Sequence, residues 1–174
     1  MALIVEDGTV VPTANSYVTR ADIIAYGAAR GVTLVDDDAT DVLGIKAMDS
    51  LDLYANQWVG SPVQPGVQPL AWPRKGAVPN GGTTPYAEDA IPGNIAKAQL
   101  ALALIASTGV DLLPTFSAAT GFVKREKVDV IETEYSEAVA LQTLGQLPTM
   151  PLVDALLEPW LAGATFGGLK TYRV

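Results

Sequence analysis

The 174-residue sequence contains no cysteine and no histidine. The lack of cysteine excludes disulfide bonds, thiol nucleophiles and zinc sites built from cysteine and histidine. Without histidine the commonest general base near neutral pH is also missing, so catalysis would have to use carboxylates, lysine or hydroxyl groups. We therefore expect a protein that is not an enzyme and that holds no metal and no cofactor.

Charged residues are also scarce. Asp, Glu, Lys and Arg make up 17% of the chain, compared with roughly 25% in typical soluble domains. The 11 basic and 19 acidic residues give a net charge of −8, and an acidic surface repels phosphate backbones. This disfavours nucleic-acid binding as the main task. A surface with few charges leaves apolar area for other copies or partners to cover, which favours an oligomer.

Long apolar runs are absent. The longest, Leu100–Ala106, is much shorter than the roughly 20 residues that a membrane-spanning helix needs. The first residues have no basic region and lead directly into Glu6 and Asp7, so they do not form a signal peptide. We expect no membrane association. Nevertheless 49% of the residues are hydrophobic, which is sufficient for the core of one domain.

Helical spacing of apolar residues predicts four helices, at about 19–30, 39–58, 91–107 and from Pro151 onward. Thr19 and Asp22 match a capping box for the first helix. One apolar stripe of the second helix contains Ala47, Leu51, Tyr54 and Trp58. The third helix is apolar on almost every face, with Asp89 or Ala90 as its cap, and should be the central buried helix.

The acidic clusters do not indicate a reaction centre. Asp36, Asp37 and Asp38 offer oxygen ligands for calcium or magnesium, but EF-hand spacing does not follow, so we expect them to cap the second helix. Asp49 and Asp52 lie on an exposed face, where such a pair is solvated. A carboxylate-based hydrolase is therefore disfavoured.

Prolines and glycines predict a long irregular loop over residues 60–88. Inside it, Leu70 and Trp72 supply apolar bulk that we expect to anchor the loop on the helices. Trp58, Trp72 and Trp160 could stack on bases, as aromatic residues of single-strand binders do. Their apolar sequence surroundings favour a place in the core.

Residues 122–136 alternate in the manner of a β-hairpin, with a change of phase at Asp129 and Val130 that a bulge or a tight turn would explain. Basic residues on the first stretch and acidic residues on the second predict a salt-bridge ladder, either across the strands or between subunits. We expect the hairpin to be an intersubunit element. Its residues are Lys124, Arg125, Lys127, Glu132 and Glu134.

The segment 162–174 is too small for a core of its own and contains three glycines. Its apolar and basic side chains suit docking on an acidic partner: Phe166, Leu169, Lys170, Tyr172, Arg173 and Val174. The expected architecture is therefore mainly α: a single domain over 1–161 built as a small bundle of about four helices. One β-hairpin, an extended N-terminal arm over 1–15 and a flexible C-terminal tail complete it.

Several blocks carry a family resemblance in the same order along the chain: Ile4–Thr9 with Asn15–Val18, Ala47–Asp52, Gln68–Arg74, Asp89–Pro92, Val123–Val128 with Ile131–Tyr135, and Val153–Leu157. Together they resemble the head–tail connector (adaptor) proteins of tailed bacteriophages, often labelled DnaT-like single-stranded DNA-binding proteins. The hairpin departs from the family, which usually has Gly-Pro where this chain has Asp129-Val130.

The resemblance implies a structural virion protein that forms a dodecameric ring beneath the portal, extends the DNA channel and offers a platform for the tail. Implied partners are further copies of the chain, the portal, through the tail 162–174, and a stopper or tail-completion protein. Genomic double-stranded DNA would pass without sequence-specific binding. The implied location is the neck of the virion, and the host cytoplasm during assembly. The alternative is a single-stranded DNA-binding replication accessory protein, but such a binder needs a basic stripe.

Overall fold

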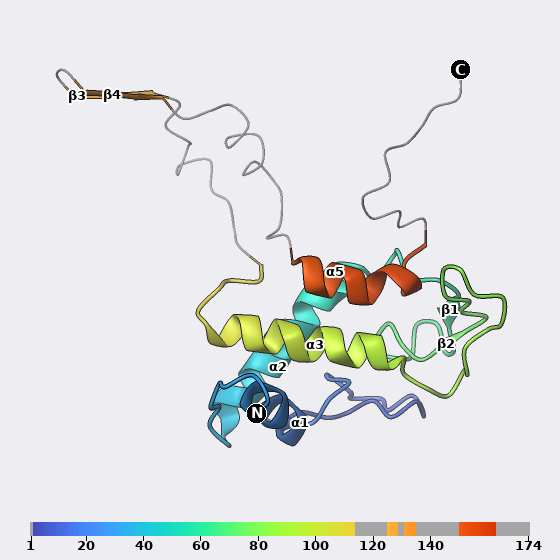
Figure 1. The fold of residues 1–174 in the computed structure, drawn as a ribbon. Helices are drawn as coiled ribbons and strands as arrows, with labels where there is room; N and C mark the ends of the chain where they lie inside the picture. The colour runs from blue at the N-terminus through green and yellow to red at the C-terminus, as the bar shows by residue number, and fades with distance from the viewer. Residues whose placement is uncertain (1, 114–124, 129–130, 135–149, 163–174) are drawn as a thin grey trace, which may run out of the picture. The chain divides into compact units, whose positions relative to one another are not determined.

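A computed structural model describes residues 2–113, 125–128, 131–134 and 150–162. The chain divides into two compact units, Met1–Val110 with Met150–Val174, and Asp111–Thr149. The described residues contain four α-helices and the antiparallel hairpin of β3 and β4 (Figure 1). The prediction of a mainly helical fold with a hairpin is therefore confirmed.

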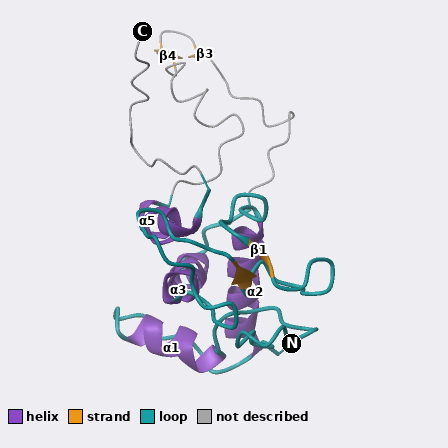
Figure 2. Cartoon of the chain, turned by 90° about the vertical axis from the view of Figure 1, so that its right-hand side faces the viewer, coloured by secondary structure: helices purple, strands orange, loops and turns teal. Residues whose placement is uncertain are grey.

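The first unit is built around one central helix. Its elements are α1 (Arg20–Ala28), α2 (Asp38–Asp52), α3 (Gly93–Ser107), α5 (Pro151–Leu157) and the 3₁₀ helix η2 (Glu158–Trp160). Helix α3 packs against α1, α2 and α5. It lies between α1 and α5 with α2 beside it (Figures 1 and 2). Its buried residues include Ile95, Ala98, Ala101, Leu102 and Ala103, which confirms its predicted central place.

The helix starts follow the sequence signals. The Thr19 hydroxyl accepts a hydrogen bond from the Asp22 N–H at 3.1 Å, and the Asp22 carboxylate accepts one from the Thr19 N–H at 2.9 Å. This is the predicted capping box. Asp37 caps α2 by accepting from the Ala39 N–H at 2.8 Å. Pro151 occupies the first turn of α5, where its missing N–H costs no hydrogen bond.

Two predicted helix boundaries are wrong. Helix α2 ends at Asp52 and not at residue 58; Trp58 lies beyond the helix and forms an antiparallel bridge with Leu161. Helix α3 begins at Gly93, with Pro92 as its N-cap, so neither Asp89 nor Ala90 caps it. The residue that precedes a proline is disfavoured in the helical conformation, which disfavours a helical Ile91.

The predicted loop over 60–88 contains a short ladder between β1 (Ser61–Pro62) and β2 (Arg74–Lys75). The ladder brings the two ends of a loop together. The rest of the segment has no helix and no further strand, as its prolines and glycines predict.

The N-terminal segment is tied down by backbone and side-chain contacts. Val5 bridges Ser16 in parallel, and the buried Glu6 carboxylate accepts hydrogen bonds from the N–H groups of Gly8, Val10 and Val11 at 2.8, 2.9 and 2.8 Å. Gly8 has φ +105°, and a Cβ there would lie 1.9 Å from the Asp89 carbonyl oxygen. Only glycine allows this approach.

In the second unit, β3 (Arg125–Val128) pairs antiparallel with β4 (Ile131–Glu134). The register sets Arg125 opposite Glu134 and Lys127 opposite Glu132. The hairpin predicted within 122–136 is thus present, whereas Asp129 and Val130 between its strands lie outside the described residues.

The second unit is an insertion in the sequence of the first, between α3 and α5, two helices that pack against each other. Among the described residues, none of the helices has the length and apolar character required to cross a bilayer.

Candidate functional site

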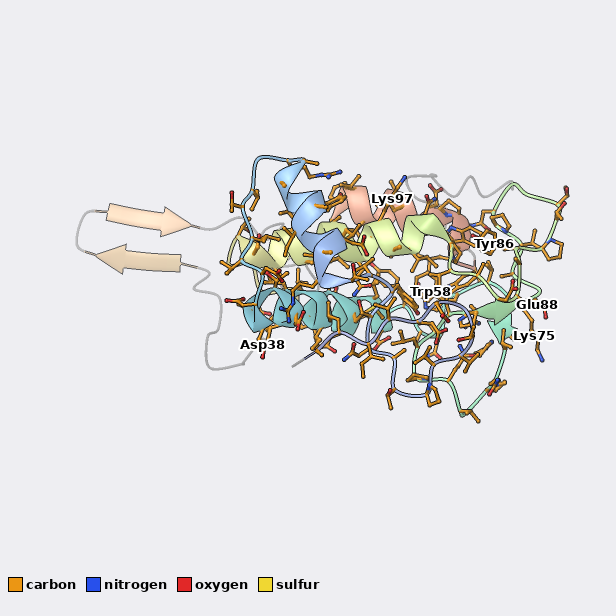
Figure 3. All side chains as sticks on the ribbon, turned by 90° about the horizontal axis from the view of Figure 1, so that it is seen from below. Asp38, Trp58, Lys75, Tyr86, Glu88 and Lys97 are labelled. Carbon is orange, nitrogen blue, oxygen red and sulfur yellow. The ribbon has the colours of Figure 1, made fainter. Side chains whose placement is uncertain are left out.

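The long loop is anchored by a cluster of aromatic rings. The Trp72 ring lies 5.3 Å from that of Trp160, 6.3 Å from Trp58 and 6.5 Å from Tyr86, in edge-to-face contacts. Trp72 has no exposed surface and Leu70 is 7% exposed. Figure 3 labels Trp58 and Tyr86, which come from the segment that follows α2 and from the loop. Both predicted anchors are thus buried, and the strength of the anchoring stays a prediction.

Arg74 follows the tryptophan and is buried in the same region, with 6% exposure. Its guanidinium donates to the carbonyls of Val59 and Gly60, each at 2.8 Å, and to that of Ala71 at 3.2 Å. Within the described ranges it forms no ion pair with a carboxylate. Burial lowers the pKa of Arg74 from its ordinary value. The side chain therefore ties two loop segments together through their backbones.

A buried polar chain connects the loop to the N-terminal segment and the central helix. The backbone N–H of Trp72 donates to the Tyr17 hydroxyl at 3.0 Å, and the backbone N–H of Tyr17 donates to Gln99 Oε1 at 2.8 Å. Gln99 Nε2 donates to Ser16 Oγ at 2.8 Å and to the Gly44 carbonyl at 3.1 Å. Burial raises the pKa of the Tyr17 hydroxyl, so it remains neutral at physiological pH.

Asn80 fastens the far part of the loop to the C-terminal elements. Its Nδ2 donates to the carbonyls of Glu158 and Leu161 at 2.6 and 2.9 Å, and its N–H donates to the Pro159 carbonyl at 2.7 Å. Neither Asn80 nor Gln99 stands out in the sequence, and Arg74 does so only as the end of the block Gln68–Arg74. The only available signal was that a long loop must satisfy many backbone groups.

The tryptophans are unsuited to stacking on bases. Trp58 is 5% and Trp160 is 7% exposed, and the indole N–H groups of Trp58, Trp72 and Trp160 are buried without an acceptor among the described residues. A base-stacking platform requires an exposed ring face. These three rings therefore contribute to packing of the core.

Basic side chains in the described part of the first unit form no stripe. Arg20 pairs with Asp41, Asp36 and Asp38, and the Arg30 guanidinium lies 3.3 Å from the centre of the Tyr26 ring. The exposed lysines come from separate elements: Lys46 on α2, Lys75 on β2 and Lys97 on α3. Figure 3 shows Lys75 and Lys97 far apart.

The acidic residues show no metal-binding arrangement within the described ranges. Arg20 lowers the pKa of Asp41 through a side-chain hydrogen bond. Asp49 and Asp52 are both exposed, and partial burial together with the Asp49 charge raises the pKa of Asp52.

The hairpin register sets Arg125 opposite Glu134 and Lys127 opposite Glu132 along the two strands. Lys124 lies outside the described residues, and so does the predicted docking set of the tail: Phe166, Leu169, Lys170, Tyr172, Arg173 and Val174.

Comparison with known proteins leads to one family. No curated protein matches the chain, and no solved structure matches it. A family model matches residues 1–174, which is the whole chain. The chain therefore belongs to the family described as "Putative DnaT-like ssDNA binding protein".

Proposed function

We propose that this protein is a head–tail adaptor of a tailed bacteriophage. Copies of the chain assemble as a ring beneath the portal, extend the DNA channel and present a platform for the tail. The ordered resemblance along the chain motivates this proposal. The observation that carries it against strand binding is the burial of Trp58, Trp72 and Trp160, because a base-stacking platform needs exposed ring faces.

The hairpin supports assembly through charge. Its register sets basic positions 125 and 127 of β3 opposite acidic positions 134 and 132 of β4. Single exposed ion pairs contribute little to stability. Repeated around a ring, the same charges can determine which surfaces of neighbouring copies meet. In this proposal the hairpin contacts the neighbouring subunit.

The net charge suits a channel that DNA must pass without sticking. Each copy carries −8, so a ring surrounds the genome with a strongly negative field. Like-charge repulsion weakens contact with the phosphates. DNA can then slide during packaging and ejection.

Single-stranded DNA binding is the second candidate, because the family description names it. Such binding would have to use basic residues of the hairpin, such as Arg125 and Lys127 on β3, together with those of the tail. Neutralised phosphates would make it strongly salt-dependent.

Mass photometry and negative-stain imaging of the purified chain, combined with an oligonucleotide shift assay at low salt, test the two candidates. Rings without a shift support the adaptor. A salt-dependent shift without rings supports strand binding, and Arg125→Glu with Lys127→Glu should then abolish the shift. Lys75→Glu with Lys97→Glu makes the same change of charge elsewhere and serves as the control.

A further inference from the structure

Helix α2 has an outer face that no other described element covers. One stripe at coiled-coil spacing contains Ala39, Val42, Lys46 and Asp49 on α2 and continues to Leu53, the helical C-cap residue, all of them exposed. Val42 is 43% and Leu53 is 46% exposed. In Figure 3 the labelled Asp38, one turn before Val42, lies on the side of α2 that faces away from α3.

The stripe reads the same in both directions. Val42 and Leu53 are its apolar ends, and Lys46 and Asp49 are its charged centre, with steps of four, three and four residues. When two copies of α2 run antiparallel about a two-fold axis, position 46 of one copy faces position 49 of the other. Position 42 likewise faces position 53. Every contact in this arrangement is therefore complementary.

Among the described residues, the two central charges have no partner in the same chain. Neither Lys46 nor Asp49 forms a hydrogen bond or an ion pair within the described ranges. A parallel pair of helices would set lysine against lysine and aspartate against aspartate, which is repulsive. Only the antiparallel register gives two attractive pairs, so the charges specify the direction as well as the partner.

We propose that the outer face of α2 binds the same face of a second copy, so that the free protein is a two-fold dimer. The partner is another copy because an isologous contact requires a self-complementary patch, and this stripe is one. The inference does not rest on the proposed ring, whose neighbours meet through two different surfaces. The 15 residues of α2 span about 22 Å, so the contact is small and the dimer weak.

Charge reversal at the centre of the stripe provides a sharp test. Lys46→Glu alone sets acidic groups against Asp49 of the other copy, and Asp49→Lys alone sets basic groups against Lys46. Each variant should raise the dimer dissociation constant by about tenfold or more, because two attractive pairs become two repulsive ones.

A mixture of the two single variants is the decisive experiment. In an equimolar mixture of Lys46→Glu chains and Asp49→Lys chains, both central pairs of a mixed dimer are attractive. The mixture should therefore dimerise although each variant alone does not, and the double variant Lys46→Glu/Asp49→Lys should dimerise by itself. Lys75→Glu and Glu88→Lys make the same charge changes at exposed positions away from α2 (Figure 3) and should leave the dimer intact.

Sedimentation velocity over about 1–100 µM measures the association, and circular dichroism verifies that each variant is folded. Dimers of the wild type, loss in both single variants and recovery in the mixture support the proposal. The proposal would be overturned by a wild type that forms no dimer, by single variants that dimerise normally, or by a mixture that stays monomeric.

Discussion

Replacement of Trp72 by alanine tests how strongly the aromatic cluster holds the long loop. The side chain has no exposed surface and contacts three aromatic rings. The nearest is that of Trp160, whose ring centre lies 5.3 Å from that of Trp72. The indole N–H has no acceptor in the described structure, so the loss comes from packing and not from a broken side-chain hydrogen bond.

The expected cost is large. A buried tryptophan changed to alanine loses about 3–5 kcal/mol of unfolding free energy, and edge-to-face pairs contribute part of that loss. For a chain of this size, such a loss lowers the melting temperature by about 6–20 °C. Trp72→Phe keeps an aromatic ring and removes the unsatisfied N–H, so it should cost clearly less.

Urea unfolding followed by far-UV circular dichroism measures both variants without relying on tryptophan emission. Leu70→Ala serves as a comparison, because Leu70 is buried in the same loop but contributes no ring. A loss below about 1 kcal/mol for Trp72→Ala would refute the anchoring role, since a cavity of that size cannot be so cheap. Unchanged stability with weakened oligonucleotide binding would instead indicate that the tryptophan contacts DNA.

Three further predictions follow from the hairpin, the tail and one ion pair. Reversal of Lys124 and Lys127 to glutamate should block ring formation while circular dichroism shows a folded chain. Normal rings on negative-stain grids would exclude the hairpin as the contact. Deletion after Leu161 should leave a folded protein that no longer binds the portal in a pull-down assay, whereas particles that assemble and retain DNA would contradict this. Asp41 pairs with Arg20, which lowers the pKa of Asp41 below the ordinary value of 3.8. Its stabilisation is therefore present above pH 3.8 and is lost as the pH falls through the lowered pKa, so Asp41→Asn should flatten the acid limb of the curve of stability against pH.

Local features of the fold were predictable because they depend on neighbouring residues. The Thr19 and Asp22 capping box needs only a three-residue spacing, and Pro151 starts a helix through its own ring. The burial of Ala47 and Leu51 follows from helical periodicity. In each case the sequence pattern and the physical cause span one turn of helix.

Features that depend on distant residues were not predictable in this way. Gly8 is required because the chain passes close to the backbone of Asp89. Gln99 can be buried because its side chain forms hydrogen bonds with Tyr17 and Ser16. Trp58 lies beyond α2 and pairs with Leu161, more than a hundred residues away. Local propensity contains no information about such encounters.

The placement of the second unit between α3 and α5 affects how the protein can vary. The helices on both sides of the insertion pack against each other in the first unit, so their contacts already hold the ends of the inserted segment. Doubling the length of a flexible closed segment costs only about 0.6 kcal/mol. Lengthening, shortening or exchanging Asp111–Thr149 should therefore cost the helical unit little, and this segment is the natural place to graft a reporter or a different partner specificity.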